Sequence, residues 1–235
     1  MKTLGELIEG ITKPVAMSTI TKKLERARSK VVGKSVKPQV IIKALENSVK
    51  KEYGVEFIHT FVSVLQKGEM NANAYYDPDA DKEGDPPIEI EMFFSPDDKK
   101  GVDVDNEGFD ILIGIMSKTI AHELLHKSQF SKRGYVKSKP FKVSKGIDPE
   151  IAATQEYMGN SDEIEAFGHN IAVELMNNLG SRKKALTALR NFVKIPPNVS
   201  GDLYAYLLAF GMDKNHPVLK KLVKKVILYL RELDK

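Results

Sequence analysis

Two histidines and a glutamate near the middle of the chain carry the clearest chemical signal in the sequence. They lie in the run His122-Glu123-Leu124-Leu125-His126. Residues four apart on a helix project from the same face one turn apart, so both imidazoles can bind one tetrahedral zinc ion. Glu123 lies about 100° round the helix, where it can accept a proton from a zinc-bound water. The spacing therefore predicts a zinc centre with His122 and His126 as ligands and Glu123 as the general base.

The composition restricts what else can hold the ion. The chain has 235 residues and no cysteine, which excludes both a disulfide framework and a thiolate zinc site. The ion must therefore have histidine and carboxylate ligands, which are more typical of catalytic than of structural sites. Basic residues outnumber acidic residues by 36 to 32, and this formal charge of +4 is too small to indicate a nucleic-acid partner by itself.

No segment of the sequence has the pattern of a membrane or export signal. Residues 1–16 alternate polar and apolar side chains at helical spacing, without the continuous apolar core of a signal peptide. No apolar run approaches the roughly 18 residues that a membrane span needs. We therefore expect a soluble, cytoplasmic protein without a membrane partner, and we favour a monomer.

The order of the expected elements is helices, strands, a central helix and further helices, which predicts an α+β fold. We expect one domain over residues 1–235, with N-terminal helices in 1–50, the sheet and the metal-site helices in 55–178, and a C-terminal helical annex in 181–235. Before the sheet, two short helices broken near Pro14 are expected, then a longer helix that opens at Pro38 and ends at Gly54. The later helices are expected over 149–157, 162–178, 183–193, 202–210 and 217–233.

The helix that carries the two histidines should begin near Asp105 or Asn106 and run to about Ser128. Residues 109–116 are apolar almost all round, which is typical of a helix buried in the middle of a domain.

Three runs of β-branched, aromatic or alternating residues predict strands, over 55–64, 71–76 and 88–93. The last run alternates strictly, so we expect one wet face and a place near the edge of the sheet. An edge strand beside the metal site would let an extended peptide pair through backbone hydrogen bonds. The acidic segment 77–87 lacks the glycine and the final glutamate of a calcium-binding loop, so we interpret it as a solvated loop.

With these motifs the sequence resembles the zincin metallopeptidases, and within them the gluzincin branch. There the third zinc ligand is a glutamate on a later helix, followed three residues on by a small residue. The segment 162–169, DEIEAFGH, matches through Glu163 and Ala166, and Glu163 follows His126 by 163 − 126 = 37 residues. Compact proteins of this design, including peptidases encoded by tailed phages, are similar.

The resemblance implies a small antiparallel or mixed sheet packed on the HExxH helix and a helical C-terminal part. It also implies Zn²⁺ as the cofactor and Glu163 as the third ligand, with the small Ala166 allowing a close approach to the HExxH helix. The implied activity is hydrolysis of a peptide or protein substrate, in the host cytoplasm if the protein is phage-encoded.

Other side chains of the same segment compete with Glu163 as the third ligand. Glu165 points to another face of the helix, so one glutamate of the two can face the metal. Asp162 and Glu165 have the spacing of a capping box, which would occupy Glu165, but Asn160 and Glu163 have the same spacing. His169 is a further alternative, although a histidine at that position is more often a core residue.

Two functions from different classes remain open. One is an active zinc peptidase, and the other is a non-catalytic zincin scaffold that binds a partner in a phage virion or in the host. Glu123 favours the enzyme, because a scaffold has no need for a general base. A nucleic-acid role for the basic segment 127–145 is disfavoured, and Tyr157, which could stabilise an oxyanion, is interpreted as a core residue.

Overall fold

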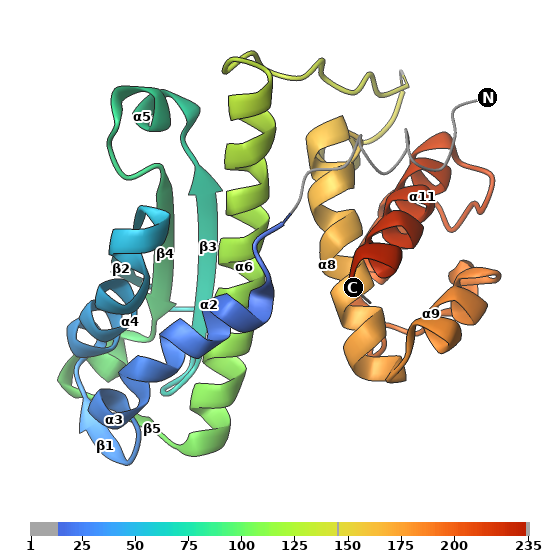
Figure 1. The fold of residues 1–235 in the computed structure, drawn as a ribbon. Helices are drawn as coiled ribbons and strands as arrows, with labels where there is room; N and C mark the ends of the chain where they lie inside the picture. Colours follow the sequence, from blue (N-terminus) through green and yellow to red (C-terminus); the bar gives the residue numbers. More distant parts are fainter. Residues whose placement is uncertain (1–13, 145, 234–235) are drawn as a thin grey trace. The chain divides into compact units, whose positions relative to one another are not determined.

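The computed structural model describes residues 14–144 and 146–233, and these fold into two compact units (Figure 1). We call the described residues up to Tyr135 the first unit and those from Val136 onward the second unit. Helices predominate and the sheets are small, which confirms an α+β protein. The sequence did not indicate a division at Tyr135, and the single domain over 1–235 stays a prediction. The helix expected before Pro14 lies outside the described residues.

A three-stranded mixed sheet forms the centre of the first unit, with β2 (Val55–Phe61), β4 (Ile88–Phe94) and β3 (Met70–Tyr76) in the order β2-β4-β3 (Figure 1). β4 pairs parallel with β2 and antiparallel with β3, in the registers Val55↔Ile88 and Met70↔Phe94. The expectation that the strand over 88–93 lies near an edge is therefore wrong. Its alternation reports one buried face, which a central strand can also have, and the edges of this sheet are β2 and β3.

Shorter elements complete the first unit. A second, antiparallel sheet pairs β1 (Lys34–Val36) with β5 (Val102–Val104). The remaining elements before the central helix are α2 (Met17–Leu24), η1 (Glu25–Ala27), α3 (Arg28–Val31), α4 (Pro38–Tyr53), α5 (Pro78–Glu83) and η2 (Pro96–Lys100).

The end of α4 and the acidic segment 77–87 test two predictions about local structure. α4 ends at Gly54, whose φ of 66° lies in the left-handed region that glycine adopts without strain, as the sequence predicted. The acidic segment 77–87 is not all loop, because it contains α5. The Asp77 carboxylate caps this helix by accepting hydrogen bonds from the backbone N–H groups of Asp79 (2.8 Å) and Ala80 (3.2 Å).

The central helix α6 (Asn106–Lys132) is the longest element and contacts both β3 and β4. Asp105 caps its start, since its carboxylate accepts a 2.7 Å hydrogen bond from the Gly108 backbone N–H. The start agrees with the sequence prediction, whereas the helix continues beyond Ser128. Ile111 and Ile115 are 57% and 49% exposed, so the expectation that residues 109–116 are buried all round is wrong.

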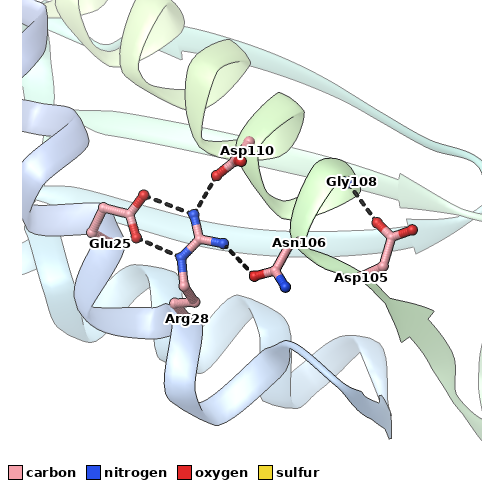
Figure 2. A network of polar contacts seen from close by, with 6 residues as sticks. All are labelled: Glu25, Arg28, Asp105, Asn106, Gly108 and Asp110. Carbon is pink, nitrogen blue, oxygen red and sulfur yellow. Dashed lines mark hydrogen bonds and ion pairs between the residues drawn. The ribbon is translucent and has the colours of Figure 1, made fainter.

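An arginine on α3 holds the first turn of α6 in place (Figure 2). Arg28 donates hydrogen bonds from Nε (2.7 Å) and Nη2 (2.9 Å) to the two carboxylate oxygens of Glu25. Its Nη1 donates to Asn106 Oδ1 (2.9 Å), and its Nη2 also pairs with Asp110. The guanidinium lies over the Phe109 ring, 4.7 Å from the centroid. Asn106 and Asp110 follow Arg28 by 78 and 82 residues in the sequence. Their contacts with Arg28 thereby fix the direction in which α6 leaves β5.

The described part of the second unit contains helices and turns without strands. Its elements are α7 (Pro149–Met158), α8 (Ser161–Leu179), α9 (Arg182–Leu189), η3 (Phe192–Lys194), α10 (Gly201–Ala209) and α11 (Pro217–Glu232). α8 and α11 pack closely, since a Cβ at Gly168 would lie 2.7 Å from Lys225 Cβ. The sequence thus predicted every α-helix of this unit within a few residues. Among the described residues, no helix is both long and apolar enough to cross a membrane.

Candidate metal centre

The two histidines of the HExxH run face each other on α6. Nε2 of His122 lies 3.1 Å from Nε2 of His126, and the ring centroids are 4.7 Å apart. Both residues are buried, with 7% and 8% of their surface exposed. Two nitrogens bound to one tetrahedral zinc at its usual Zn–N distance lie about 3.3 Å apart. The observed pair therefore fits two ligands of a single ion.

A glutamine one turn further along α6 orients the second histidine. Nδ1 of His126 lies 2.9 Å from Oε1 of Gln129, a side chain that is 4% exposed. An amide oxygen only accepts hydrogen bonds, so Nδ1 of His126 carries the proton. In the neutral tautomer with the proton on Nδ1, Nε2 keeps the lone pair that a metal ligand requires, and this atom faces His122. Sequence reasoning missed Gln129, although its position three residues after His126 places it on the same face of the helix.

Glu123 lies on α6 between the two histidines in sequence and is 7% exposed. A carboxylate is rarely this buried without a partner or a chemical role. The tertiary fold thus removes Glu123 from bulk water together with both imidazoles. A general base beside a metal needs this environment, because proton transfer there must compete with solvent.

Among the described residues, His122, His126 and Glu163 each offer one ligand atom, and these atoms all lie within 4.8 Å of one another. This group can hold a metal ion. Glu163 is half-buried in the first turn of α8. The donors are two imidazole nitrogens and one carboxylate oxygen, which are ligand types that zinc accepts.

The start of α8 determines how Glu163 is presented. Asn160 is the capping residue, and its Oδ1 accepts a 2.9 Å hydrogen bond from the Asp162 backbone N–H. Oδ1 of Asn160 also accepts a 2.8 Å hydrogen bond from the Ser138 hydroxyl. Asp162 is thus the second residue of the helix rather than its cap. Of the two capping-box spacings that the sequence left open, the one that begins at Asp162 is therefore excluded, and Asn160 is the cap.

Glu165 and His169, the competing ligands, are both engaged by α11. Glu165 forms an ion pair with Lys225 Nζ (3.0 Å) and accepts a hydrogen bond from the Tyr229 hydroxyl (3.2 Å). The His169 ring packs edge-on against Tyr229 at 5.2 Å. Glu163 and Glu165 are about 200° apart round the helix, so a helix that turns Glu165 to α11 turns Glu163 away from it.

The C-terminal end of α6 is held by a half-buried aspartate of α5. Asp81 forms a 2.7 Å ion pair with Lys127, the residue after His126. It also accepts hydrogen bonds from the hydroxyls of Tyr76 (2.8 Å) and Tyr135 (3.2 Å). Burial alone would raise the pKa of the Asp81 carboxyl, but the hydrogen bonds from Lys127, Tyr76 and Tyr135 outweigh it and lower the pKa. These contacts fix the helix turn that presents His126.

The sequence prediction that Tyr157 is a core residue is wrong. Tyr157 is 52% exposed at the end of α7, so it is not the core residue that the sequence predicted. Its ring meets Phe167 of α8 edge-on at 6.3 Å, which leaves much of the ring at the surface. The disfavoured alternative, in which this phenol stabilises an oxyanion, is not tested by its exposure.

Comparisons of the chain with models of known protein families, with curated proteins and with solved structures find no match. The interpretation of the site therefore depends on its own geometry and chemistry.

Proposed function

We propose that the protein is a zinc-dependent peptidase whose general base is Glu123. The observation that carries the proposal is the buried imidazole pair on α6, with Nε2 atoms 3.1 Å apart and Glu123 buried between the two residues in sequence. Gln129 supports it by holding His126 in the tautomer that a metal ligand needs. Zinc is the ion of choice because imidazole and carboxylate donors without thiolates are typical of catalytic zinc sites.

We further propose that Glu163 is the third ligand. Its support is the clustering of its carboxylate oxygen with the two imidazole nitrogens and the engagement of Glu165 and His169 by α11. Three protein ligands leave a fourth position for water or substrate, which is the arrangement of catalytic rather than structural zinc. When bound, zinc would polarise the scissile carbonyl and lower the pKa of a water molecule towards about 7. Glu123 would then take up the proton and return it to the leaving amine.

The class of substrate is inferred from the sheet. β3 is an edge strand and contacts α6, the helix that carries both histidines (Figure 1). An extended peptide can add to such an edge through backbone hydrogen bonds, which recognise any sequence in the extended conformation. This supports a peptide or protein substrate over a small molecule.

The proposal is tested with protein purified without added metal. We expect one zinc per chain by elemental analysis, and cleavage of members of a peptide library. A chelator should abolish the cleavage, and stoichiometric zinc should restore it. Protein that neither contains nor takes up zinc would overturn the proposal. Protein that binds zinc but leaves every peptide intact would instead favour the non-catalytic scaffold, in which case capture experiments identify the partner.

A further inference from the structure

A tyrosine of α10, Tyr206, is buried with a hydroxyl that forms no hydrogen bond among the described residues. Tyr206 is fully buried, and its oxygen has no hydrogen-bond partner among the described residues. The ring packs against Phe167 (5.4 Å between centroids) and stacks on Phe210 (6.1 Å). Burying a hydroxyl without a partner costs free energy that a phenylalanine at the same position would avoid. The hydroxyl therefore calls for an explanation beyond packing.

The position of Tyr206 relative to α8 supplies one. α10 packs against α8, and Phe167 follows Glu163 by four residues on α8, so both lie on one face of that helix. The Tyr206 ring, which packs on Phe167, therefore contacts α8 about one helical turn from Glu163. Burial is the main reason that the pKa of Tyr206 lies well above its ordinary value. The negative charge of Glu163 raises this pKa further, by more than Tyr157 or Asp202 does. The phenol remains protonated at neutral pH and can only donate to a carboxylate.

We propose that Tyr206 is a positioning residue for Glu163. With zinc bound, its hydroxyl would turn to donate a hydrogen bond to one carboxylate oxygen of Glu163 and leave the other oxygen to bind the metal; without the ion it has no partner among the described residues. This inference rests on the proposed role of Glu163 as a zinc ligand. Groups that hold a bound ligand in this way fix its orientation at the metal, and their removal weakens metal binding by about 10–100-fold.

A second buried tyrosine of the same unit provides a matched control. Tyr229 of α11 is also fully buried, but its hydroxyl donates to Glu165, on the side of α8 away from Glu163. Tyr206→Phe and Tyr229→Phe remove the same atom from the two sides of α8. Only the first should affect zinc, and only the second removes a hydrogen bond that the structure shows.

The test measures zinc affinity by competition with a chelator, and thermal unfolding of the metal-free proteins. Tyr206→Phe should weaken zinc binding by about 10–100-fold while leaving the metal-free midpoint unchanged or higher. Tyr229→Phe should lower that midpoint and leave zinc affinity unchanged. In a Glu163→Gln background, Tyr206→Phe should cause no further loss, because both changes act through the same carboxylate.

Several outcomes would overturn the inference without touching the proposed function. Unchanged zinc affinity in Tyr206→Phe, with Glu163→Gln still weakening it, would show that the hydroxyl does not position the ligand. Additive losses in the double variant would show that it acts elsewhere. If Asp202→Asn rather than Glu163→Gln removed the effect of Tyr206→Phe, the hydroxyl would be shown to serve Asp202. Absence of zinc binding in the unaltered protein would instead contradict the proposed function itself.

Discussion

Nδ1 of His126 lies 2.9 Å from Oε1 of Gln129, and both side chains are buried. This contact decides which ring nitrogen carries the proton, and hence which one can bind a metal. We predict that Gln129→Met, which keeps the volume but removes the acceptor, weakens zinc affinity by about 10–100-fold. Gln129→Glu keeps an acceptor for Nδ1–H and should retain most of the affinity. Chelator competition measures both, and equal affinity in Gln129→Met and the unaltered protein would contradict the role of Gln129.

The histidine pair should account for all of the bound zinc. We predict that His122→Ala and His126→Ala each abolish stoichiometric binding. Zinc at 100 times its dissociation constant should raise the free energy of unfolding of the unaltered protein by about 2.7 kcal/mol, and neither variant should respond. His59→Ala is the control, since His59 lies on β2 and contacts Gln39 instead. If the variant that carries both His122→Ala and His126→Ala still bound one zinc ion per chain, the assignment of the two ligands would be refuted.

The choice between the two glutamates of α8 is directly testable. Glu163→Gln should weaken zinc binding strongly. Glu165→Gln should retain zinc but lose about 1–3 kcal/mol of stability, because its ion pair with Lys225 is weakened in a mostly buried position. Elemental analysis and chemical denaturation of the two variants separate these effects. The reverse pattern would identify Glu165 as the ligand.

Glu123→Gln should leave zinc bound and the fold intact while peptide hydrolysis falls by a factor of about 10²–10⁴ or more. Glutamine keeps the size and the hydrogen-bonding reach but cannot accept the proton. Turnover is compared on the same peptides with zinc quantified in both samples, and equal rates would show that Glu123 is not the base. Zinc-loaded Glu123→Gln can also trap a partner. A trapped protein that the unaltered protein cleaves supports the peptidase, and one that it leaves intact supports the scaffold.

Asp81 should make the first unit sensitive to acid. Its pKa in the folded protein is below the ordinary value of 3.8, so it contributes stability above that value, and this contribution is lost as the pH falls through the folded pKa. We predict that Asp81→Asn lowers the free energy of unfolding at pH 7 and reduces its fall below about pH 4. Asp79→Asn, at an exposed position of the same helix, is the control. A variant with the unaltered pH profile would refute this account.

Much of the site was predictable because it is local. The four-residue spacing of His122 and His126 determines that both imidazoles lie on one face of any helix containing them, and the helix was predictable from its cap at Asp105 and its apolar period. Likewise, the alternation in β4 determines that one face is buried. Each of these features depends only on the backbone period and on residues within about a turn of one another.

The tertiary structure decided what depends on distant partners. Whether β4 is central or at an edge follows from β2 and β3, which alternation within one strand cannot report. The local sequence favours Glu163 over Glu165 only by a resemblance, whereas Lys225 and Tyr229 of α11, about 60 residues later, engage Glu165 directly. The sequence by itself therefore determined which residue types share a helix face. Long-range packing decided which of them are buried, paired and turned towards one another, because burial and pairing are set by side chains that the local period does not describe.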